Sequence, residues 1–165
     1  MTTAPFRISI LGKQDRSAFR CGVEALDRYF HAQAGQDMRR KIAACYVLEE
    51  VASGIIAGYY TLSAADIPMN EAPNDLTRRL PRYPSLPVAR LGRLAIDERF
   101  RGRKLGSALL ANAASRAAAN DVAMFAMIVD AKDDDAMAFY RHHGFVAYGS
   151  SPMTLIAPLK DLLPE

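Results

Sequence analysis

One stretch, residues 91–111, constrains the fold more than any other part of the chain. It reads as a buried strand over 91–96, a short basic turn, and a helix that begins near residue 103 or 104. The apolar residues of this helix recur every four positions, which predicts that one face packs against a sheet. They are Leu105, Leu109, Ala113 and Ala117, with Leu110 beside them.

The turn between this strand and helix combines cations with glycines: Arg101, Gly102, Arg103, Lys104 and Gly106. The first amides of a helix have no intrahelical partner, and the helix dipole favours an anion beside them. Glycine allows a pyrophosphate to approach the backbone closely. We therefore predict that a phosphorylated ligand binds the turn, with a solvated helix cap as the alternative. The glycine patterns of P-loop and dinucleotide-binding proteins do not follow the strand.

Length and composition predict a single domain, residues 1–165, with a full hydrophobic core. Half of the positions are apolar, but no run of 18 apolar residues predicts a membrane span. Residues 1–7 lack the charged start and apolar centre of a signal peptide. Cys21 and Cys45 have no metal-binding spacing, so we expect two reduced core cysteines in the cytoplasm and no metal site.

Positive charge is concentrated between residues 78 and 104, where nine Lys and Arg accompany only two acidic residues, whereas the whole chain has a net charge of +3. Such a patch favours a polyanionic partner because binding releases counterions. The alternative is a patch that serves only the phosphates at the turn. Beyond the turn, five arginines are available to bind nucleic acid: Arg78, Arg79, Arg82, Arg90 and Arg93.

The remaining segments follow helix or strand patterns. Strands are predicted over 6–11, 42–51, 54–64, 88–96, 122–129, 145–148 and 153–157, and helices over 17–36 (after Gly22), 104–120 and 133–141. Gly35 is expected to end the first helix, and Asp133 to cap the last one, which Gly144 stops. Ala52 and Ser53 suggest a hairpin, and the proline-rich loop 66–87 is expected to hold a short helix at 75–80. This order predicts an α/β fold with a mixed sheet.

Two motifs resemble those of the GNAT N-acetyltransferases. The turn resembles their acetyl-CoA signature, with Arg101 in its first place and Gly106 in its last, although Lys104 stands where the family usually has a glycine. Residues 133–145 resemble a second signature, with Asp133 in place of the usual Asn. The resemblance implies the GNAT fold, a mixed and mostly antiparallel sheet in which the central strand splays from its neighbour between flanking helices.

Four further segments resemble the GNAT toxins of type II toxin–antitoxin modules: 19–30, 58–63, 79–87 and 92–97. This resemblance covers about residues 6 to 159. It implies an enzyme that uses acetyl-CoA to acetylate the α-amino group of aminoacyl-tRNA and thereby stops translation. It also implies restraint by a ribbon-helix-helix antitoxin and assembly into a homodimer.

The GNAT resemblance also assigns site residues. Peptide groups of Leu94, Ala95 and Ile96 are expected to contact the pantetheine arm, and the turn is expected to hold the pyrophosphate through Arg101, Gly102, Arg103, Lys104, Leu105, Gly106 and Ser107. The second signature adds Asp133, Ala136 and Phe139, although core packing is the favoured interpretation of Phe139. Tyr140 is expected to hydrogen-bond the thioester sulfur and to protonate the leaving thiolate, because a phenol donates a proton at neutral pH.

No general base is evident, and His31, His142 and His143 read as surface or capping residues. An α-amine titrates near ~7.7–8.0 and a lysine near ~10.4, so an α-amine needs a base far less. Two other functions stay open at this stage. One is a GNAT enzyme that acetylates a small amine or a protein N-terminus, and the other is an inactive GNAT-like binding module.

Overall fold

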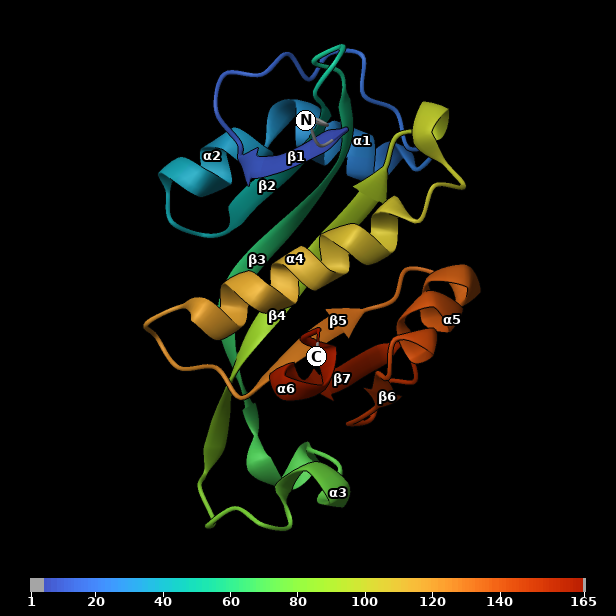
Figure 1. Cartoon of the computed structure of the whole chain (residues 1–165). Helices are drawn as coiled ribbons and strands as arrows, with labels where there is room; N and C mark the ends of the chain where they lie inside the picture. Colours follow the sequence, from blue (N-terminus) through green and yellow to red (C-terminus); the bar gives the residue numbers. More distant parts are fainter. Residues whose placement is uncertain (1–4, 165) are drawn as a thin grey trace. The chain divides into compact units, whose positions relative to one another are not determined.

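The computed structural model describes residues 5–164, whose strands and helices are labelled in Figure 1. The strands are β1 (Phe6–Ile10), β2 (Ala44–Glu50), β3 (Ile56–Pro68), β4 (Ser85–Ile96), β5 (Ala126–Asp130), β6 (Val146–Ala147) and β7 (Thr154–Pro158). The helices are α1 (Glu24–Ala32), α2 (Ala34–Arg39), α3 (Asn74–Thr77), α4 (Leu105–Ala119), α5 (Asp134–His142) and α6 (Leu159–Leu162). Two 3-10 helices, η1 (Met69–Glu71) and η2 (Glu98–Phe100), lie in the connections.

The strand order in the sheet is β1-β2-β3-β4-β5-β7-β6. Strand β4 pairs with β5 in parallel, whereas β1–β2, β2–β3, β5–β7 and β6–β7 are antiparallel pairs. The predicted mixed, mostly antiparallel α/β sheet is therefore confirmed. The pairing of β4 with β5 runs from Val88 to Leu91, and β4 itself continues to Ile96.

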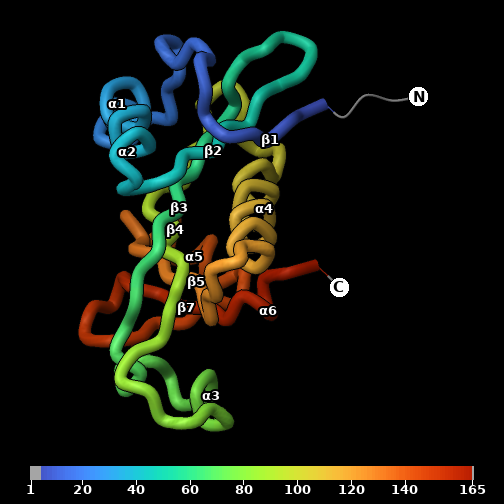
Figure 2. The backbone as a smooth tube through the Cα atoms, turned by 90° about the vertical axis from the view of Figure 1, so that its left-hand side faces the viewer, coloured from blue at the N-terminus to red at the C-terminus, as the bar shows by residue number. Residues whose placement is uncertain are grey.

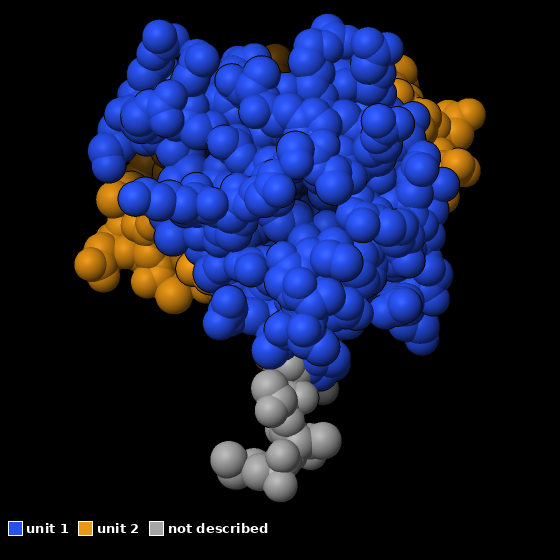
Figure 3. Space-filling view, turned by 90° about the horizontal axis from the view of Figure 1, so that it is seen from above, with its two compact units in different colours: residues 1–63, 92–113 blue, residues 64–91, 114–165 orange. Residues whose placement is uncertain are grey.

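The chain divides into two compact units, coloured separately in Figure 3. Unit 1 comprises residues 1–63 and 92–113, and unit 2 comprises residues 64–91 and 114–165. The prediction of one domain over 1–165 includes residues 1–4 and 165, which lie outside the described residues, and it stays a prediction.

Aromatic packing on one face of β3 forms the core of unit 1. The rings of Tyr59 and Phe30 stack with their centroids 4.3 Å apart, and Phe19 meets Tyr59 edge-on at 5.5 Å. The next residue, Tyr60, points to the opposite face, where its hydroxyl donates to Asn112 Oδ1 at 2.6 Å. This alternation along a strand places α1 and α2 on one face and the first part of α4 on the other (Figure 2).

Strands β3 and β4 approach closely at Gly58. A Cβ atom there would lie 2.9 Å from the carbonyl oxygen of Ala95 and 2.8 Å from Cδ1 of Ile96. Because real Cβ atoms do not tolerate such distances, this position requires glycine. The close approach fixes the end of β4 that precedes the basic turn.

Unit 2 has its own apolar cluster, in which Ile67, Val88, Ile128 and Ile156 are buried on neighbouring strands. Helix α3 lies at the tip of the long β3–β4 hairpin (Figure 1). Helix α5 begins where predicted, because Asp133 Oδ1 accepts a hydrogen bond from the Ala136 amide at 2.8 Å.

Three local predictions were wrong. Gly35 does not end the first helix: it lies in α2, whose neighbouring Ala34 is fully buried, and the break falls at Gln33. Strand β5 begins at Ala126 rather than at 122, because the Asn120 side chain accepts a hydrogen bond from the Val122 amide in a turn. The loop predicted at 66–87 is shorter, since β3 extends to Pro68 and β4 begins at Ser85.

Candidate acetyl-transfer site

The basic turn of unit 1 contains two residues in the left-handed region of backbone space. Gly102 has a φ of +80° and Lys104 a φ of +59°. Glycine adopts this conformation without strain, whereas a residue with a Cβ does so at a cost of about 1–2 kcal/mol. Lys104 therefore holds a glycine-type conformation at the very position where the signature usually has a glycine.

Helix α4 starts directly after Lys104, and its first bond runs from the Ala108 amide to the Lys104 carbonyl at 3.3 Å. The amides of Leu105 and Gly106 precede that bond, so the helix supplies no carbonyl for them. The Lys104 side chain is exposed, and within residues 5–164 it forms no ion pair. The turn therefore offers backbone donors and an unpaired cation to an anion.

The two arginines of the turn are engaged by the protein. The guanidinium of Arg101 donates to the Cys21 carbonyl at 2.5 Å and lies 3.9 Å from Glu98. The guanidinium of Arg103 lies 3.8 Å from Glu50, with its Cζ 5.2 Å from the Phe100 ring centroid. In this arrangement both side chains hold the turn in place.

Asp97 fastens the start of the turn and has only 1% of its surface exposed. Its carboxylate accepts from the Arg20 amide at 3.0 Å, the Arg99 amide at 2.9 Å and Arg99 Nε at 2.9 Å. Burial raises the pKa of this carboxyl, but the hydrogen bonds from Arg99 and Arg20 outweigh it, so the pKa lies below its usual value. Sequence reasoning gave Asp97 no role, although an Asp directly after a strand is a typical cap.

The β4 residues predicted to contact the pantetheine arm lie beyond the stretch that pairs with β5. Ala95 is buried, while Leu94 and Ile96 are half-buried. The amide of the following residue, Asp97, donates to the Ala57 carbonyl at 2.8 Å. One edge of this end of β4 is thus held by β3.

In unit 2, Tyr140 lies on α5 and is 7% exposed. Its ring packs edge-on against Phe139 at 5.2 Å and Phe145 at 5.4 Å. Burial raises the pKa of its phenol above the usual value, so the hydroxyl stays protonated at neutral pH. Phe139 is half-buried and also contacts His143 at 4.9 Å, which agrees with core packing.

The other predicted residues of α5 and the histidines have structural contacts. The carboxylate of Asp133 caps α5 through the amide of Ala136, which is half-buried. His31 Nε2 lies 2.9 Å from the Phe19 carbonyl, and His142 is exposed. Burial, with a smaller contribution from His142, lowers the pKa of His143.

The five arginines predicted to bind nucleic acid separate into three groups. Arg78, Arg79 and Arg82 are exposed beside α3 in unit 2. Arg90 forms an ion pair with Asp130 at 3.0 Å. Arg93, in unit 1, has its Cζ only 3.5 Å from the centroid of the Tyr29 ring. The exposed trio is thus the most available to phosphate.

No group of three or more His, Cys, Asp or Glu in residues 5–164 could hold a metal ion. In the same part of the chain, no helix is both long and apolar enough to cross a membrane. Cys21 and Cys45 are buried cysteines that form no disulfide within the described residues.

Comparison with known proteins identifies the family. The model of the acetyltransferase (GNAT) domain matches residues 41–147. A tRNA-acetylating toxin of Mycobacterium tuberculosis (strain ATCC 25618 / H37Rv) is 34% identical over 161 residues, which are 96% of this chain and 93% of the relative.

Two solved structures of the toxin AtaT are also similar. AtaT complexed with acetyl-methionyl-tRNAfMet has a TM-score of 0.85 at 29% identity, covering 95% of this chain and 96% of that one. A tyrosine-to-phenylalanine mutant of AtaT, bound to acetyl-CoA and the C-terminus of the antitoxin AtaR, has a TM-score of 0.80 at 27% identity and covers 96% of both chains. The chain belongs to the GNAT acetyltransferase family and, within it, to the group that contains these toxins.

Proposed function

We propose that this chain is an acetyl-CoA-dependent N-acetyltransferase toxin that acetylates the α-amino group of aminoacyl-tRNA and so blocks translation. The observation that carries the proposal is the similarity to a tRNA-acetylating toxin over 96% of the chain at 34% identity. The likeness to AtaT bound to acetyl-methionyl-tRNAfMet supports the same substrate class.

The residues of the basic turn fit acetyl-CoA. A Cβ added at Gly102 would meet nothing within 4 Å, so the turn is open at its left-handed glycine. The amides at the start of α4 and the Lys104 ammonium would hold the pyrophosphate. Peptide groups of Leu94, Ala95 and Ile96 would hold the pantetheine arm. In the pyrophosphate set, Gly102, Leu105, Gly106 and Ser107 would add backbone groups, while Arg101 and Arg103 would hold the turn in place. The α5 set comprises Asp133, Ala136 and Phe139.

Acetyl-CoA supplies an acetyl group on a thioester, whose C–S bond breaks as the bond from carbon to the amine nitrogen forms. In our proposal Tyr140 donates its phenolic proton to the departing sulfur. The raised pKa supports this role, because the phenol remains an acid over the whole physiological pH range. The amine loses its own proton to solvent.

The absence of an evident base fits an α-amine substrate. At pH 7, roughly a tenth of an α-amine with a pKa near ~7.7–8.0 is already neutral. A lysine side chain, with a pKa near ~10.4, is neutral in well under a thousandth of molecules. An α-amine therefore requires no dedicated general base.

Exposed arginines provide the RNA contacts in this proposal. Arg78, Arg79 and Arg82 would bind phosphates without reading sequence, and Arg90 and Arg93 would add further contacts to the same RNA. We further propose that a ribbon-helix-helix antitoxin restrains the enzyme, that two copies form a homodimer, and that the protein acts in the cytoplasm, where its substrate is made. The similar structure of AtaT bound to the C-terminus of the antitoxin AtaR supports the proposal that an antitoxin binds this chain.

The test uses purified full-length protein, labelled acetyl-CoA and a pool of charged tRNA, with the deacylated pool as control. Label on the aminoacyl group of the charged pool alone is the expected result. No transfer to either pool, with acetyl-CoA bound and slowly hydrolysed, would refute the tRNA proposal and favour a small amine or a protein N-terminus as substrate.

A further inference from the structure

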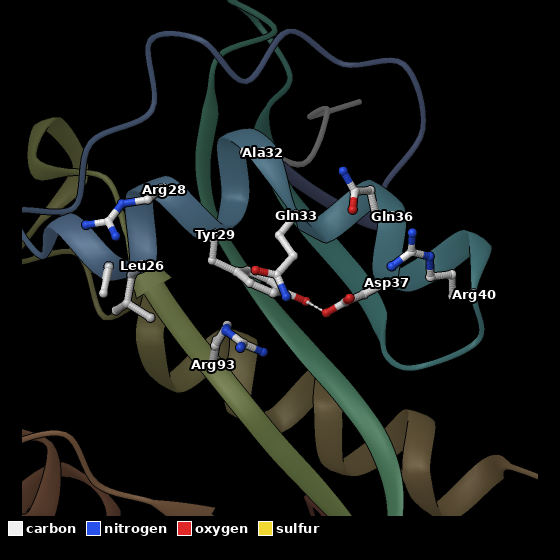
Figure 4. Close-up of a pocket in the computed structure, with 10 residues that line it drawn as sticks. Leu26, Arg28, Tyr29, Ala32, Gln33, Gln36, Asp37, Arg40 and Arg93 are labelled. Atoms are coloured by element: carbon white, nitrogen blue, oxygen red, sulfur yellow. Dashed lines mark hydrogen bonds between the residues drawn. The ribbon is translucent and has the colours of Figure 1, made fainter.

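A hollow of about 480 Å³ lies in unit 1, where α1 and α2 face β4 (Figure 4). This volume is within the range of small-molecule sites in proteins. The polar residues that carry the argument are Tyr29, Gln33, Gln36, Asp37, Arg40 and Arg93. None of them belongs to the basic turn at 101–107, so the hollow is built from a separate set of residues.

The wall of the hollow includes a contact between Arg93 and Tyr29. The guanidinium lies over the ring, with Cζ 3.5 Å from the ring centroid, which is a close cation–π contact. The ring is 5% exposed, and its hydroxyl donates to Asp37 Oδ2 at 2.8 Å (Figure 4). Because Arg93 also lines the hollow, the part of its planar guanidinium that does not face the ring can meet a ligand there.

The charge of the hollow favours an anion. Three cations line it, and Asp37 is already engaged by the Tyr29 hydroxyl. Arg28 pairs with Glu24 at 3.2 Å, whereas Arg40 and Arg93 form no ion pair within residues 5–164. The side-chain amides of Gln33 and Gln36 add donors and also acceptors, and the acceptors suit the N–H groups of a base edge better than the oxygens of a phosphate.

These groups together match a nucleotide. Unstacked bases bind on arginine planes, amides read the edges of bases, and cations neutralise phosphates. Bases in a duplex are stacked and cannot enter a hollow, whereas a single-stranded end can place one there. In an aminoacyl-tRNA, the single-stranded 3′ end carries the amino acid.

We propose that this hollow binds the 3′-terminal nucleotide of the RNA substrate, with Arg93 stacking on the base and Arg40 binding a phosphate. The inference rests on the proposed function and extends it, because holding the terminal nucleotide also positions the aminoacyl group. Of the residues that line the hollow, only Arg93 was predicted from the sequence to bind nucleic acid, and no such role was predicted for the residues of α1 and α2.

The test compares Arg40→Ala with the control Arg39→Ala. Arg39 is the adjacent exposed arginine at the end of the same helix, but it does not line the hollow, so the control removes the same charge outside the proposed site. The probes are a fluorescent single-stranded RNA that ends in CCA and the same RNA without its terminal adenosine. Arg40→Ala should weaken binding of the CCA probe by about tenfold, the effect of one charged hydrogen bond, and Arg39→Ala by less than about twofold. Removing the adenosine should weaken binding to the wild type and to Arg39→Ala by a similar factor. It should weaken binding to Arg40→Ala by a smaller factor, because that variant has already lost the phosphate contact and keeps only the stacking on Arg93.

Equal losses in the two variants would overturn the site in favour of a general basic surface. Weaker acetyl-CoA binding by Arg40→Ala, with RNA binding unchanged, would also overturn it and assign the hollow to the cofactor. The proposed function is tested apart, by wild-type acetylation of charged tRNA. If the wild type acetylates charged tRNA but the two variants have the same KM for it, only the nucleotide-site proposal is refuted. If Arg40→Ala alone raises this KM and leaves kcat unchanged, the nucleotide-site proposal is supported.

Discussion

Replacing Tyr140 by Phe removes one hydroxyl from the proposed site and little else. The ring is 7% exposed and packs against Phe139 and Phe145, contacts that a phenylalanine ring reproduces. Burial is the only cause that raises the pKa of the phenol within residues 5–164, with no hydrogen bond to its hydroxyl, so the substitution breaks no internal hydrogen bond. We therefore expect the free energy of unfolding to change by less than about 0.5 kcal/mol.

The substitution should lower the rate of acetyl transfer strongly while it leaves the stability of the fold almost unchanged. Loss of a general acid costs about 10²–10⁴-fold, which raises the barrier by about 2.7–5.4 kcal/mol. The raised pKa of Tyr140 adds a prediction on pH: the wild-type rate should not decline below about pH 10 through ionisation of this group. Binding of acetyl-CoA should stay near the wild-type value.

The assay measures initial rates of label transfer from acetyl-CoA to charged tRNA for the wild type and Tyr140→Phe, together with unfolding midpoints and acetyl-CoA affinity. A variant that retains its rate within about threefold would refute the assigned proton donation. A large loss of rate together with a large loss of stability would show that the ring packing, rather than the hydroxyl, is responsible.

Three further predictions concern the turn, its anchor and the RNA surface. Lys104→Gly should be about 1 kcal/mol more stable than Lys104→Ala in chemical unfolding, because both remove the cation but only glycine relieves the φ of +59°; equal stabilities would contradict the strain. Asp97→Asn should lower the free energy of unfolding by about 1.5–3 kcal/mol at pH 7. Because the folded pKa of Asp97 lies below its unfolded value, this difference should shrink as the pH falls below about 4, and a constant difference would refute the assignment. Arg78→Ala with Arg79→Ala should weaken RNA binding and reduce the slope of log affinity against log salt by up to about 2, which a salt series measures; an unchanged slope would exclude both from phosphate contact.

Some features around the site could be predicted from the sequence because they depend only on residues that are near one another in the chain. The four-residue repeat of α4 required only helix geometry, and its predicted stripe, from Leu105 to Ala117, is buried. The cap at Asp133 and the stop at Gly144, which has a φ of +96°, depend on a few neighbouring residues. Gly35 failed as a stop signal because burial of the adjacent Ala34 outweighed a local preference.

Contacts between distant segments could not be read in this way. Arg101 looked like a phosphate ligand in the sequence, yet its guanidinium binds the Cys21 carbonyl, 80 positions away. Arg93 looked like one member of a basic patch, yet it lies against Tyr29 of α1. Long cationic side chains reach many alternative partners, and only the packing of the chain selects one of them.

The sequence by itself determined the strand–turn–helix unit, the α/β class and the signature residues that mark the GNAT family, because periodicity and motif spacing are properties of the linear chain. Only the tertiary structure decided the left-handed backbone of Lys104, the buried anchor at Asp97 and the hollow lined by Tyr29, Arg40 and Arg93. The physical reason is that a hydrogen bond, a cation–π contact or a cavity exists only between groups that folding has brought together. Their energies depend on distance and burial, which no single segment specifies.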